Sequence, residues 1–316
     1  MGAYHAVEAD YNIQYKRQGV DRAMGIGAFG QVRPCTHAAT HTLRAVKRIE
    51  KEGWHTRRKV MQEVAVLQAV CGRHPNIVEF VEYFEEWGSM SLIFEFCSRG
   101  NIEEELAKGA VSSSERAIAP FFKQLASALA FLHREEIVHR DVKPSNLLIA
   151  DSGTLKLADF GSACFVNEPL RTPEGTPAFF APEQHQLPRG NGYSLPVDVW
   201  ASGVSLFMML FGREHPFVVD GCIDKQRLKA GEFSVGWLTT ARATDLLSWL
   251  LLPHPDQRIS AAEIREHAWL ASYGLGSGSF AKPQQRKLIL DSHGNWLSSP
   301  WTHRSGFLQH GAVACF

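Results

Sequence analysis

The spacing of apolar and polar residues divides the chain into a strand-rich first part and a helical second part. In the first part, LRAVKRI (43–49), HPNIVEFVEYF (74–84) and MSLIFEF (90–96) are rich in β-branched and aromatic residues and are predicted to be strands. One stretch, RRKVMQEVAVLQAV (57–70), instead repeats its apolar residues at helical spacing. We therefore expect a small, mostly antiparallel sheet with one helix.

After Gly100 the apolar residues recur with the helical period. The segment AIAPFFKQLASALAFLH (117–133) carries them on one face, which is typical of a helix that packs on a core. A loop is expected over 160–183. The same patterns predict further elements, namely helices near 196–212, 240–252 and 260–270 and short strands at 147–149 and 154–157.

These patterns predict an α+β protein with two lobes. The smaller, β-rich lobe with one main helix covers about 11–97, and the larger helical lobe covers about 98–271. Residues 1–10 form an N-terminal extension and 272–316 a C-terminal tail, which includes the linker-like stretch GLGSGSF. Two joined lobes place a ligand site in the cleft between them.

Composition narrows the classes of function. Lys+Arg and Asp+Glu both number 33, so the formal net charge is zero and no global field favours nucleic acid or a membrane surface. The most apolar segment, 199–211, is too short to span a bilayer and is expected to be a buried helix. The six cysteines form no CxxC pair, which favours reduced thiols in the cytoplasm or nucleus. A monomer is expected.

A glycine-rich stretch, GIGAFGQV (25–32), has the composition of a phosphate-binding loop. Its glycines would let the backbone approach phosphates closely and present N–H groups to them. An ordinary hairpin turn has the same composition, and Lys47 alone would be interpreted as a surface lysine. Lys47 nevertheless lies on a predicted buried strand, where it needs a partner. Glu63 on the following helix is a plausible partner, and the lysine would then face phosphate oxygens.

The stretch HRDVKPSN (139–146) combines residues that phosphoryl transfer requires. Asp141 could orient an attacking hydroxyl and accept its proton, and Lys143 could neutralise the moving phosphoryl group. Asn146 and the downstream Asp159 offer oxygen ligands that suit Mg²⁺ held between protein and phosphates. Each residue alone is more often an ordinary loop residue. Their order after the glycine-rich stretch favours the catalytic interpretation.

Together these stretches match the signature set of eukaryotic protein kinases, and the chain resembles that family from about Tyr11 to Leu270. The resemblance implies the bilobal protein-kinase fold and transfer of the γ-phosphate of ATP with Mg²⁺ as cofactor. Lys143, two residues after Asp141, is similar to serine/threonine kinases, so Ser/Thr of a protein substrate is the expected acceptor.

By matching positions, the resemblance assigns a role to each site residue. Phe94 would be the gatekeeper, and Glu95 and Cys97 would offer hinge backbone to adenine. The implied catalytic residues are Asp141, Lys143, Lys47 and Glu63, the metal ligands are Asn146 and Asp159, and the ATP-binding residues are Gly25, Ile26, Gly27, Ala28, Phe29, Gly30, Val32, Ala45, Lys47, Phe94, Glu95, Cys97 and Leu148.

Structural contacts are expected around these residues. The resemblance implies that Thr176 hydrogen-bonds Asp141 and Lys143. Glu183 and Arg258 are expected to form a buried ion pair without a catalytic role. The resemblance also implies an apolar spine anchored at Asp198 and made of Leu67, Phe80, His139 and Phe160.

Two residues are candidates for regulation. Family members with an arginine at the position of Arg140 are often switched by phosphorylation, since a phosphate can pair with basic residues and order the activation loop. Thr172, three residues before Gly175 and followed by Pro173, lies where that phosphate is common. An unmodified loop threonine is the alternative.

Three stretches, KPSN (143–146), GTPAFFAPE (175–183) and FGREHPF (211–217), are similar to the calcium/calmodulin-dependent protein kinase kinases. Members of that subgroup activate other kinases by phosphorylating their activation loops. Asn101 and Ser145 stand where many basophilic kinases carry glutamates, so strong selection for arginine in the substrate is not expected.

Alternatives to an active protein kinase remain open. A pseudokinase, that is, a binding module with this fold, would lack the lysine, the aspartate or the asparagine, and a small-molecule kinase would lack the APE stretch with its distant arginine; this chain has them all. The tail could be an autoinhibitory or interaction segment. Its run KPQQRKLIL (282–290) is basic and apolar but short, and calmodulin is not expected as a partner.

Overall fold

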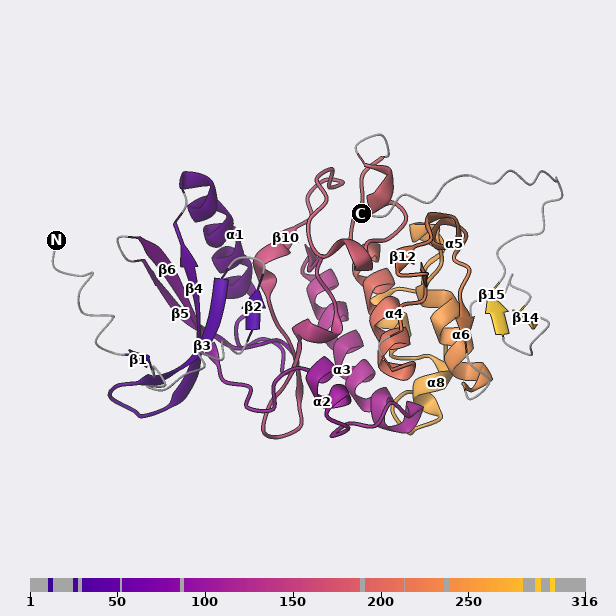
Figure 1. Cartoon of the computed structure of the whole chain (residues 1–316), viewed down its shortest axis with the longest axis horizontal. Coiled ribbons are helices and arrows are strands. Elements are labelled where there is room, and N and C mark those ends of the chain that lie inside the picture. The colour runs from indigo at the N-terminus through magenta and orange to yellow at the C-terminus, as the bar shows by residue number, and fades with distance from the viewer. Residues whose placement is uncertain are drawn as a thin grey trace.

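The computed structural model confirms the bilobal α+β architecture, with a β-rich lobe and a helical lobe side by side along the long axis (Figure 1). The structure describes residues 11–13, 25–27, 30–51, 53–85, 88–187, 191–212, 214–235, 239–280, 288–290 and 296–298. Most of the run KPQQRKLIL lies outside the described residues, which contain only its last three, the strand β14 (Leu288–Leu290).

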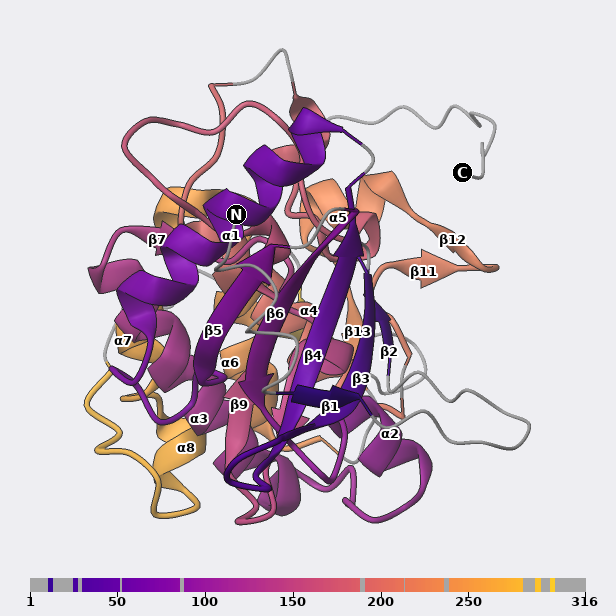
Figure 2. The ribbon, with the colours of Figure 1, turned by 90° about the vertical axis from the view of Figure 1, so that its left-hand side faces the viewer.

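The first lobe is built on one antiparallel sheet in the strand order β1-β3-β4-β6-β5, with β2 paired to β3. The helix α1 covers this sheet (Figure 2). It buries Val60, Val64 and Leu67 at helical spacing. The elements are β1 (Tyr11–Ile13), β2 (Gly25–Gly27), β3 (Gly30–His37), β4 (Leu43–Glu50), α1 (Trp54–Val70), β5 (Phe80–Glu85) and β6 (Ser89–Glu95).

One predicted strand begins later than its apolar pattern suggested. The stretch 74–84 was expected to be a single strand, but β5 begins only at Phe80. The preceding residues bind the second lobe instead, because the Val78 N–H donates to the Leu157 carbonyl at 3.0 Å and the Leu157 N–H donates to the Asn76 carbonyl at 2.8 Å. The alternating apolar residues before Phe80 therefore belong to a segment that contacts the second lobe.

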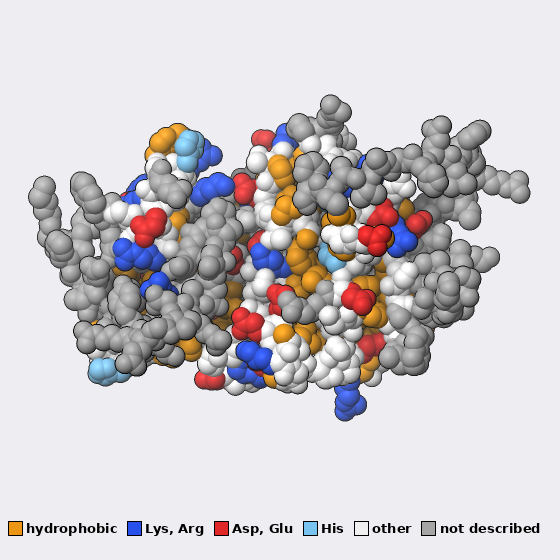
Figure 3. All heavy atoms as spheres, in the orientation of Figure 1, with side chains coloured by type: hydrophobic (Ala, Val, Ile, Leu, Met, Phe, Trp, Pro, Cys, Tyr) orange, Lys and Arg blue, Asp and Glu red, His pale blue; other side chains and the backbone are white. Residues whose placement is uncertain are grey.

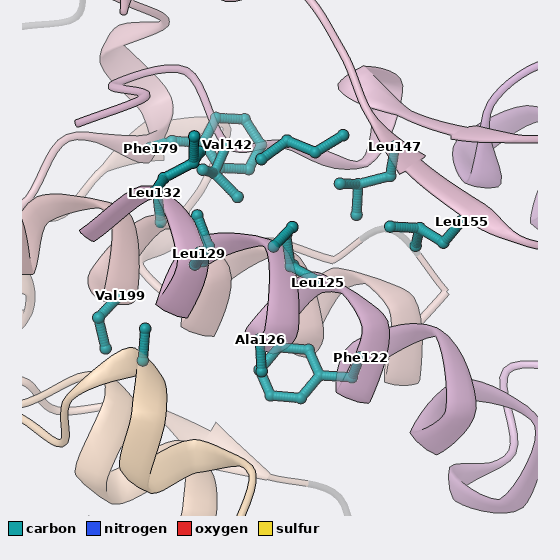
Figure 4. Close-up of a cluster of buried hydrophobic side chains, with 14 of the residues drawn as sticks. Phe122, Leu125, Ala126, Leu129, Leu132, Val142, Leu147, Leu155, Phe179 and Val199 are labelled. Atoms are coloured by element: carbon teal, nitrogen blue, oxygen red, sulfur yellow. The ribbon is translucent and has the colours of Figure 1, made fainter. Parts of the chain in front are cut away.

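The second lobe is organised around α3 (Glu115–Arg134), which packs against α4 (Pro196–Leu210) and carries β8 (Leu147–Ile149) and β9 (Leu155–Leu157) on its other side. Figure 4 shows Leu125 of α3 on the side of the helix that faces Leu147 and Leu155 from this β8–β9 ladder, whereas Phe122 and Ala126 lie on the opposite side. Its remaining elements are α2 (Ile102–Ala107), β7 (Ile137–Val138), β10 (Cys164–Phe165), β11 (Val218–Val219), β12 (Cys222–Ile223), α5 (Lys225–Ala230), β13 (Ser234–Val235), α6 (Ala241–Leu250), α7 (Ala261–Ile264), α8 (Ala268–Ala271), β14 (Leu288–Leu290) and β15 (Trp296–Ser298).

Side-chain caps explain why some helix boundaries differ from those that the apolar pattern predicted. The helix expected near 260–270 is divided into α7 and α8, because Ser260 forms a capping box at the first and the His267 side chain accepts the Trp269 N–H at the second. The short helices α2 and α5 were not predicted. Their first N–H groups are capped by the side chains of Asn101 and Asp224.

The apolar segment 199–211 is the buried core helix α4, as expected. Glu183 and Arg258 form the predicted ion pair, with two N–O distances of 2.9 and 3.1 Å, beneath the ring of Trp200. Within the described ranges, no helix is long and apolar enough to span a membrane.

The cysteines agree only partly with the expectation of reduced thiols. Cys35, Cys71, Cys97 and Cys164 are free. Cys222 is disulfide-bonded, so the expectation that all the cysteines are reduced is wrong.

The linker-like stretch after α8 packs on the second lobe despite its composition. The Phe280 ring lies 5.6 Å from the Trp249 ring, and the Phe280 N–H donates to the Glu266 carbonyl. The Tyr273 hydroxyl donates to Glu115 Oε2 at 2.9 Å. Burial, with a smaller contribution from this hydrogen bond, raises the pKa of Tyr273 to about 12. Short-range composition therefore did not predict these contacts.

Glu115 is expected to be a strong determinant of stability. Its carboxylate also accepts the Trp269 indole N–H at 2.8 Å and both the N–H and hydroxyl of Thr240. Glu115→Ala leaves these donors without their acceptor, so the free energy of unfolding should fall by about 2–4 kcal/mol. Chemical denaturation measures it, and the exposed Glu232→Ala should change it by less than about 0.5 kcal/mol. Equal effects of the two changes would contradict this expectation.

Candidate active site

A buried lysine joins the two lobes. Lys47, on β4, places its Nζ 2.8 Å from Glu63 Oε1 on α1 and 2.8 Å from Asp159 Oδ1 in the second lobe. Only 4% of Lys47 is exposed. The predicted Lys47–Glu63 pair is thus present, and Asp159 is a second partner that the sequence pattern had not paired with this lysine.

Electrostatics keeps this cluster charged. Burial by itself would lower the pKa of Lys47, but the carboxylates of Glu63 and Asp159 outweigh it and raise the pKa. Burial raises the pKa of Glu63, although Lys47 opposes this. The pKa of Asp159 is lowered, because the attraction of Lys47 exceeds the effect of burial. One ammonium therefore serves two carboxylates, and Asp159 is the more acidic of them.

Strand register gathers the expected adenine contacts on one face of the sheet. Val32 lies opposite Lys47, and Ala45 lies opposite Phe94. Directly opposed residues share a face, as do residues two apart on one strand. Val32, Ala45, Lys47 and Phe94 consequently face the same side, where the Phe94 ring also contacts the Phe80 ring at 5.7 Å.

The connection between the lobes is fixed by an ion pair. Glu95 accepts from Lys156 Nζ at 2.7 Å and from the Glu79 N–H at 2.7 Å. Cys97 is buried, which raises the pKa of its thiol to about 12 with a smaller contribution from Glu95. Leu148, on β8, is half-buried against the core of the second lobe.

The glycine-rich stretch forms the hairpin of β2 and β3, with Gly27 opposite Gly30 and Gly25 opposite Val32. Ile26 pairs with Gln31 in the same ladder. Ala28 and Phe29 lie outside the described residues.

The Asp141 carboxylate accepts hydrogen bonds at both oxygens. Oδ1 accepts from the N–H and hydroxyl of Thr176 at 2.8 and 2.6 Å. Oδ2 lies 2.8 Å from Lys143 Nζ and accepts from Asn146 Nδ2 at 3.0 Å. Lys143 Nζ also donates to the Thr176 hydroxyl at 2.6 Å, so the predicted Thr176 contacts are confirmed.

Asp198 fixes the backbone that carries Asp141. It lies in the first turn of α4, as expected, and its fully buried carboxylate accepts the N–H groups of His139 and Arg140 at 2.8 Å each. His139 is neutral in this arrangement: Nε2–H donates to the Ala158 carbonyl, and Nδ1 accepts the Asp141 N–H. Burial lowers the pKa of His139.

The expected apolar spine is buried throughout, with the His139 and Phe160 rings edge-to-face at 4.8 Å. It comprises Leu67, Phe80, His139 and Phe160, all at most 5% exposed.

The oxygen donors suit a magnesium ion shared with phosphates. Asn146 Nδ2 donates to the carbonyl and Oδ2 of Asp141. The amide oxygen of Asn146 therefore points away from Asp141 and is available as a metal ligand. Asp159 accepts from Lys47 through Oδ1, so its Oδ2 can serve as a metal ligand. Among the described residues, no group of three or more His, Cys, Asp or Glu could hold a metal ion without help. One carboxylate and one amide fit Mg²⁺ that takes its other ligands from phosphates and water.

Comparison with known proteins agrees with this geometry. A family description of the protein kinase domain matches residues 19–270. The chain belongs to the protein kinase family.

Curated relatives of this kinase chain include serine/threonine kinases of animals and plants. Serine/threonine-protein kinase DCLK1 of Rattus norvegicus is 34% identical over 274 residues, which cover 82% of this chain and 61% of the relative. Serine/threonine-protein kinase PEPKR2 of Arabidopsis thaliana is 34% identical over 259 residues, covering 80% and 53%. CBL-interacting protein kinase 5 of Oryza sativa subsp. japonica is 30% identical over 299 residues, covering 91% and 63%. The matches span less than two thirds of each relative's length.

The loop over 160–183 is the kinase's activation segment, and two of its contacts were not predicted. The hydroxyl of Tyr193 donates to the Thr172 carbonyl at 2.7 Å and accepts from the Arg140 guanidinium at 3.2 Å. Glu174 lies 3.3 Å from Lys59 on α1. The only sequence signal for the second contact was the position of Lys59 one turn before Glu63, and the first had none.

Gly175 is held against the stretch 139–146, the catalytic loop. Its φ of 105° lies in the region that favours glycine, and a Cβ there would lie 2.1 Å from the Arg140 carbonyl oxygen. We expect Gly175→Ala to displace Thr176 from Asp141 and to lower kcat by about tenfold or more. The matched control is Gly212→Ala, which has φ 65° and open space around its Cβ position. It should cost stability without lowering kcat; a Gly175→Ala enzyme with unchanged kcat would contradict this account.

Stability should fall with acid between pH 7 and pH 5. Burial lowers the pKa values of His74, His139 and His215 in the folded protein. Below their ordinary pKa near 6.5 the unfolded chain therefore binds protons that the folded chain does not, and unfolding becomes easier by up to about 1.4 kcal/mol per pH unit for each fully buried histidine. Glu63, with its raised pKa, opposes this trend.

Denaturant titrations across that range measure the slope of unfolding free energy against pH. His215→Gln removes one of these titrating groups while an amide can still donate to the Ala178 carbonyl, which the His215 ring contacts at 2.8 Å. The slope should be smaller in this variant. A slope that is flat in the wild type, or equal in both proteins, would contradict the assignment.

Proposed function

We propose that this chain is an active protein kinase that transfers the γ-phosphate of ATP, with Mg²⁺, to serine or threonine of protein substrates. The observation that carries the proposal is the hydroxyl of Thr176 between Asp141 and Lys143, 2.6 Å from each side chain. A substrate hydroxyl needs the same two contacts. Asp141 would accept its proton, and Lys143 would neutralise charge on the phosphoryl group that the hydroxyl receives. The side chains of Asp141 and Lys143 are therefore placed to bind an aliphatic hydroxyl.

Each residue has a distinct role in the proposed mechanism. Asp141 orients the substrate hydroxyl and accepts its proton, and the hydrogen bond from Asn146 keeps its carboxylate in position. Lys143 neutralises charge on the transferred group. Lys47, kept charged by Glu63, binds the α- and β-phosphates. ATP supplies the phosphoryl group together with Mg²⁺, which Asn146 and Asp159 would hold.

The proposal also assigns the remaining ATP contacts to the sheet and to the connection between the lobes. The β2–β3 hairpin would present glycine backbone to the phosphates. Phe94 would close the back of the adenine site, and the backbone of Glu95 and Cys97 would face adenine. The proposed apolar contacts above and below the ring are Val32, Ala45 and Leu148.

A finer proposal concerns the substrate. We propose that the acceptor is the activation loop of another kinase, on the basis of the similarity of 143–146 and 175–183 to calcium/calmodulin-dependent protein kinase kinases. Asn101 caps α2 by accepting the Glu104 N–H. Its side chain is a neutral amide, so this position offers no negative charge to a basic substrate. On the face shown in Figure 3, described side chains of both signs are interspersed, and they form no large basic field. Recognition of a folded protein surface is consistent with both observations.

Asp141→Asn is expected to lower kcat by about 10²–10⁴-fold while the KM for ATP changes little, because the amide keeps the shape but cannot accept the proton. Transfer of labelled γ-phosphate from ATP·Mg²⁺ to a generic serine/threonine peptide measures it. The exposed Asp256→Asn is the matched control and should keep full activity.

The acceptor is tested in the same assay by adding a catalytically inactive kinase domain beside the peptide. Preference for the domain, with the phosphate on its activation loop, supports the upstream role, and preference for the peptide contradicts it. No transfer to either acceptor by the wild type would contradict the enzymatic proposal and favour a pseudokinase scaffold.

A further inference from the structure

The Arg140 guanidinium is engaged by groups of the chain itself. Its Nε donates to the Ser162 carbonyl, and a second nitrogen donates to the Tyr193 hydroxyl at 3.2 Å. Tyr193 is only 3% exposed, and its hydroxyl donates onward to the Thr172 carbonyl at 2.7 Å. A buried chain of hydrogen bonds thus runs from the catalytic loop to the activation segment.

The backbone strengthens the same connection. Leu170 and Tyr193 exchange two backbone hydrogen bonds, at 2.8 and 2.9 Å. Gly192 makes this approach possible, since a Cβ there would lie 2.9 Å from the Leu170 carbonyl oxygen. The stretch before Gly175 is therefore fixed by side-chain and main-chain contacts to the residues just before α4.

A second connection ties the activation segment to α1. Glu174 lies 3.3 Å from Lys59, and the nearby Gln62 side chain donates to the Ala163 carbonyl at 3.2 Å. Lys59 precedes Glu63 by one helical turn, so the two side chains share a face of α1. The Glu174–Lys59 pair therefore favours the helix position in which Glu63 reaches Lys47.

We propose that Tyr193 and Glu174 are positioning residues that anchor the activation segment, so that activity does not depend on phosphate at Thr172. An activation-loop phosphate acts by giving basic residues an anion to pair with. Here Arg140 is bound by a carbonyl and a phenol, and Lys59 by a carboxylate, all of them parts of the chain. Thr172 itself is exposed. The inference rests on the proposed kinase activity.

The first test compares Thr172→Ala with the wild type before and after phosphatase treatment, in the γ-phosphate transfer assay. The kcat values should agree within about twofold. Intact-mass measurement reports whether the active wild type carries phosphate. A loss of about tenfold or more in Thr172→Ala, matched by the phosphatase-treated wild type, would overturn the proposal. A wild type without any activity would instead contradict the proposed function.

The second test removes the Tyr193 hydroxyl. Tyr193→Phe removes both hydrogen bonds of the hydroxyl and should lower kcat by about three- to tenfold, with the KM for ATP unchanged. The matched control is Tyr273→Phe. The Tyr273 hydroxyl of the wild type donates to Glu115 at 2.9 Å on the same lobe. The control should lower the melting temperature but not kcat. If both variants lower kcat alike, or neither does, Tyr193 has no positioning role.

The third test reverses the charges of the surface pair. Lys59→Glu and Glu174→Lys should each raise the KM for ATP by about two- to fivefold, the range for an exposed ion pair. The double variant Lys59→Glu/Glu174→Lys should recover the wild-type KM. Additive losses in the double variant would show that the pair does not couple α1 to the activation segment.

Discussion

The catalytic loop depends on one fully buried carboxylate, that of Asp198. Its two oxygens accept the N–H groups of His139 and Arg140, and His133 lies 3.1 Å from one of them. Burial alone would raise the pKa of Asp198, but the hydrogen bonds from His133 and from the His139 N–H help to outweigh it and lower the pKa. A buried carboxylate that stays charged is costly unless every contact is made, so it fixes the loop backbone closely.

The position of Asp141 follows from that anchor. His139, held by Asp198, accepts the Asp141 N–H through Nδ1, while the carboxylate of Asp141 is bound by Lys143, Asn146 and Thr176. Thr176 can reach it only because Gly175 has no side chain. The activation segment and the catalytic loop therefore form one hydrogen-bonded unit, and a change in either should be felt at the reacting hydroxyl.

Lys47 makes the corresponding connection between the lobes. Its single ammonium neutralises a carboxylate from α1 and another from the second lobe. Neither carboxylate could be buried at low cost without it. The arrangement of the lobes and the position of α1 are thus coupled to one charge. The contacts of Lys59 with Glu174 and of Gln62 with the Ala163 carbonyl, both made from α1, act on the same helix.

The bilobal α+β class and the main helices could be predicted from the sequence. The same is true of the candidate site residues, because glycines, acids and amides at fixed spacings report local requirements of phosphate and metal chemistry. The Glu183–Arg258 and Lys47–Glu63 pairs were predicted correctly, since buried charges need partners of opposite sign. Short helices and the boundaries of β5 and α7 were not, because their caps and contacts between lobes override the apolar pattern.

Which residues meet across long distances in the sequence depends on the tertiary structure. Tyr193 carries no local signature, yet folding brings its hydroxyl between Arg140 and Thr172. Phe280 belongs to a stretch of linker composition, yet it packs against Trp249. Hydrogen-bond partners far apart in sequence depend on how strands and helices are placed, and that placement is fixed by packing of the whole core rather than by neighbouring residues.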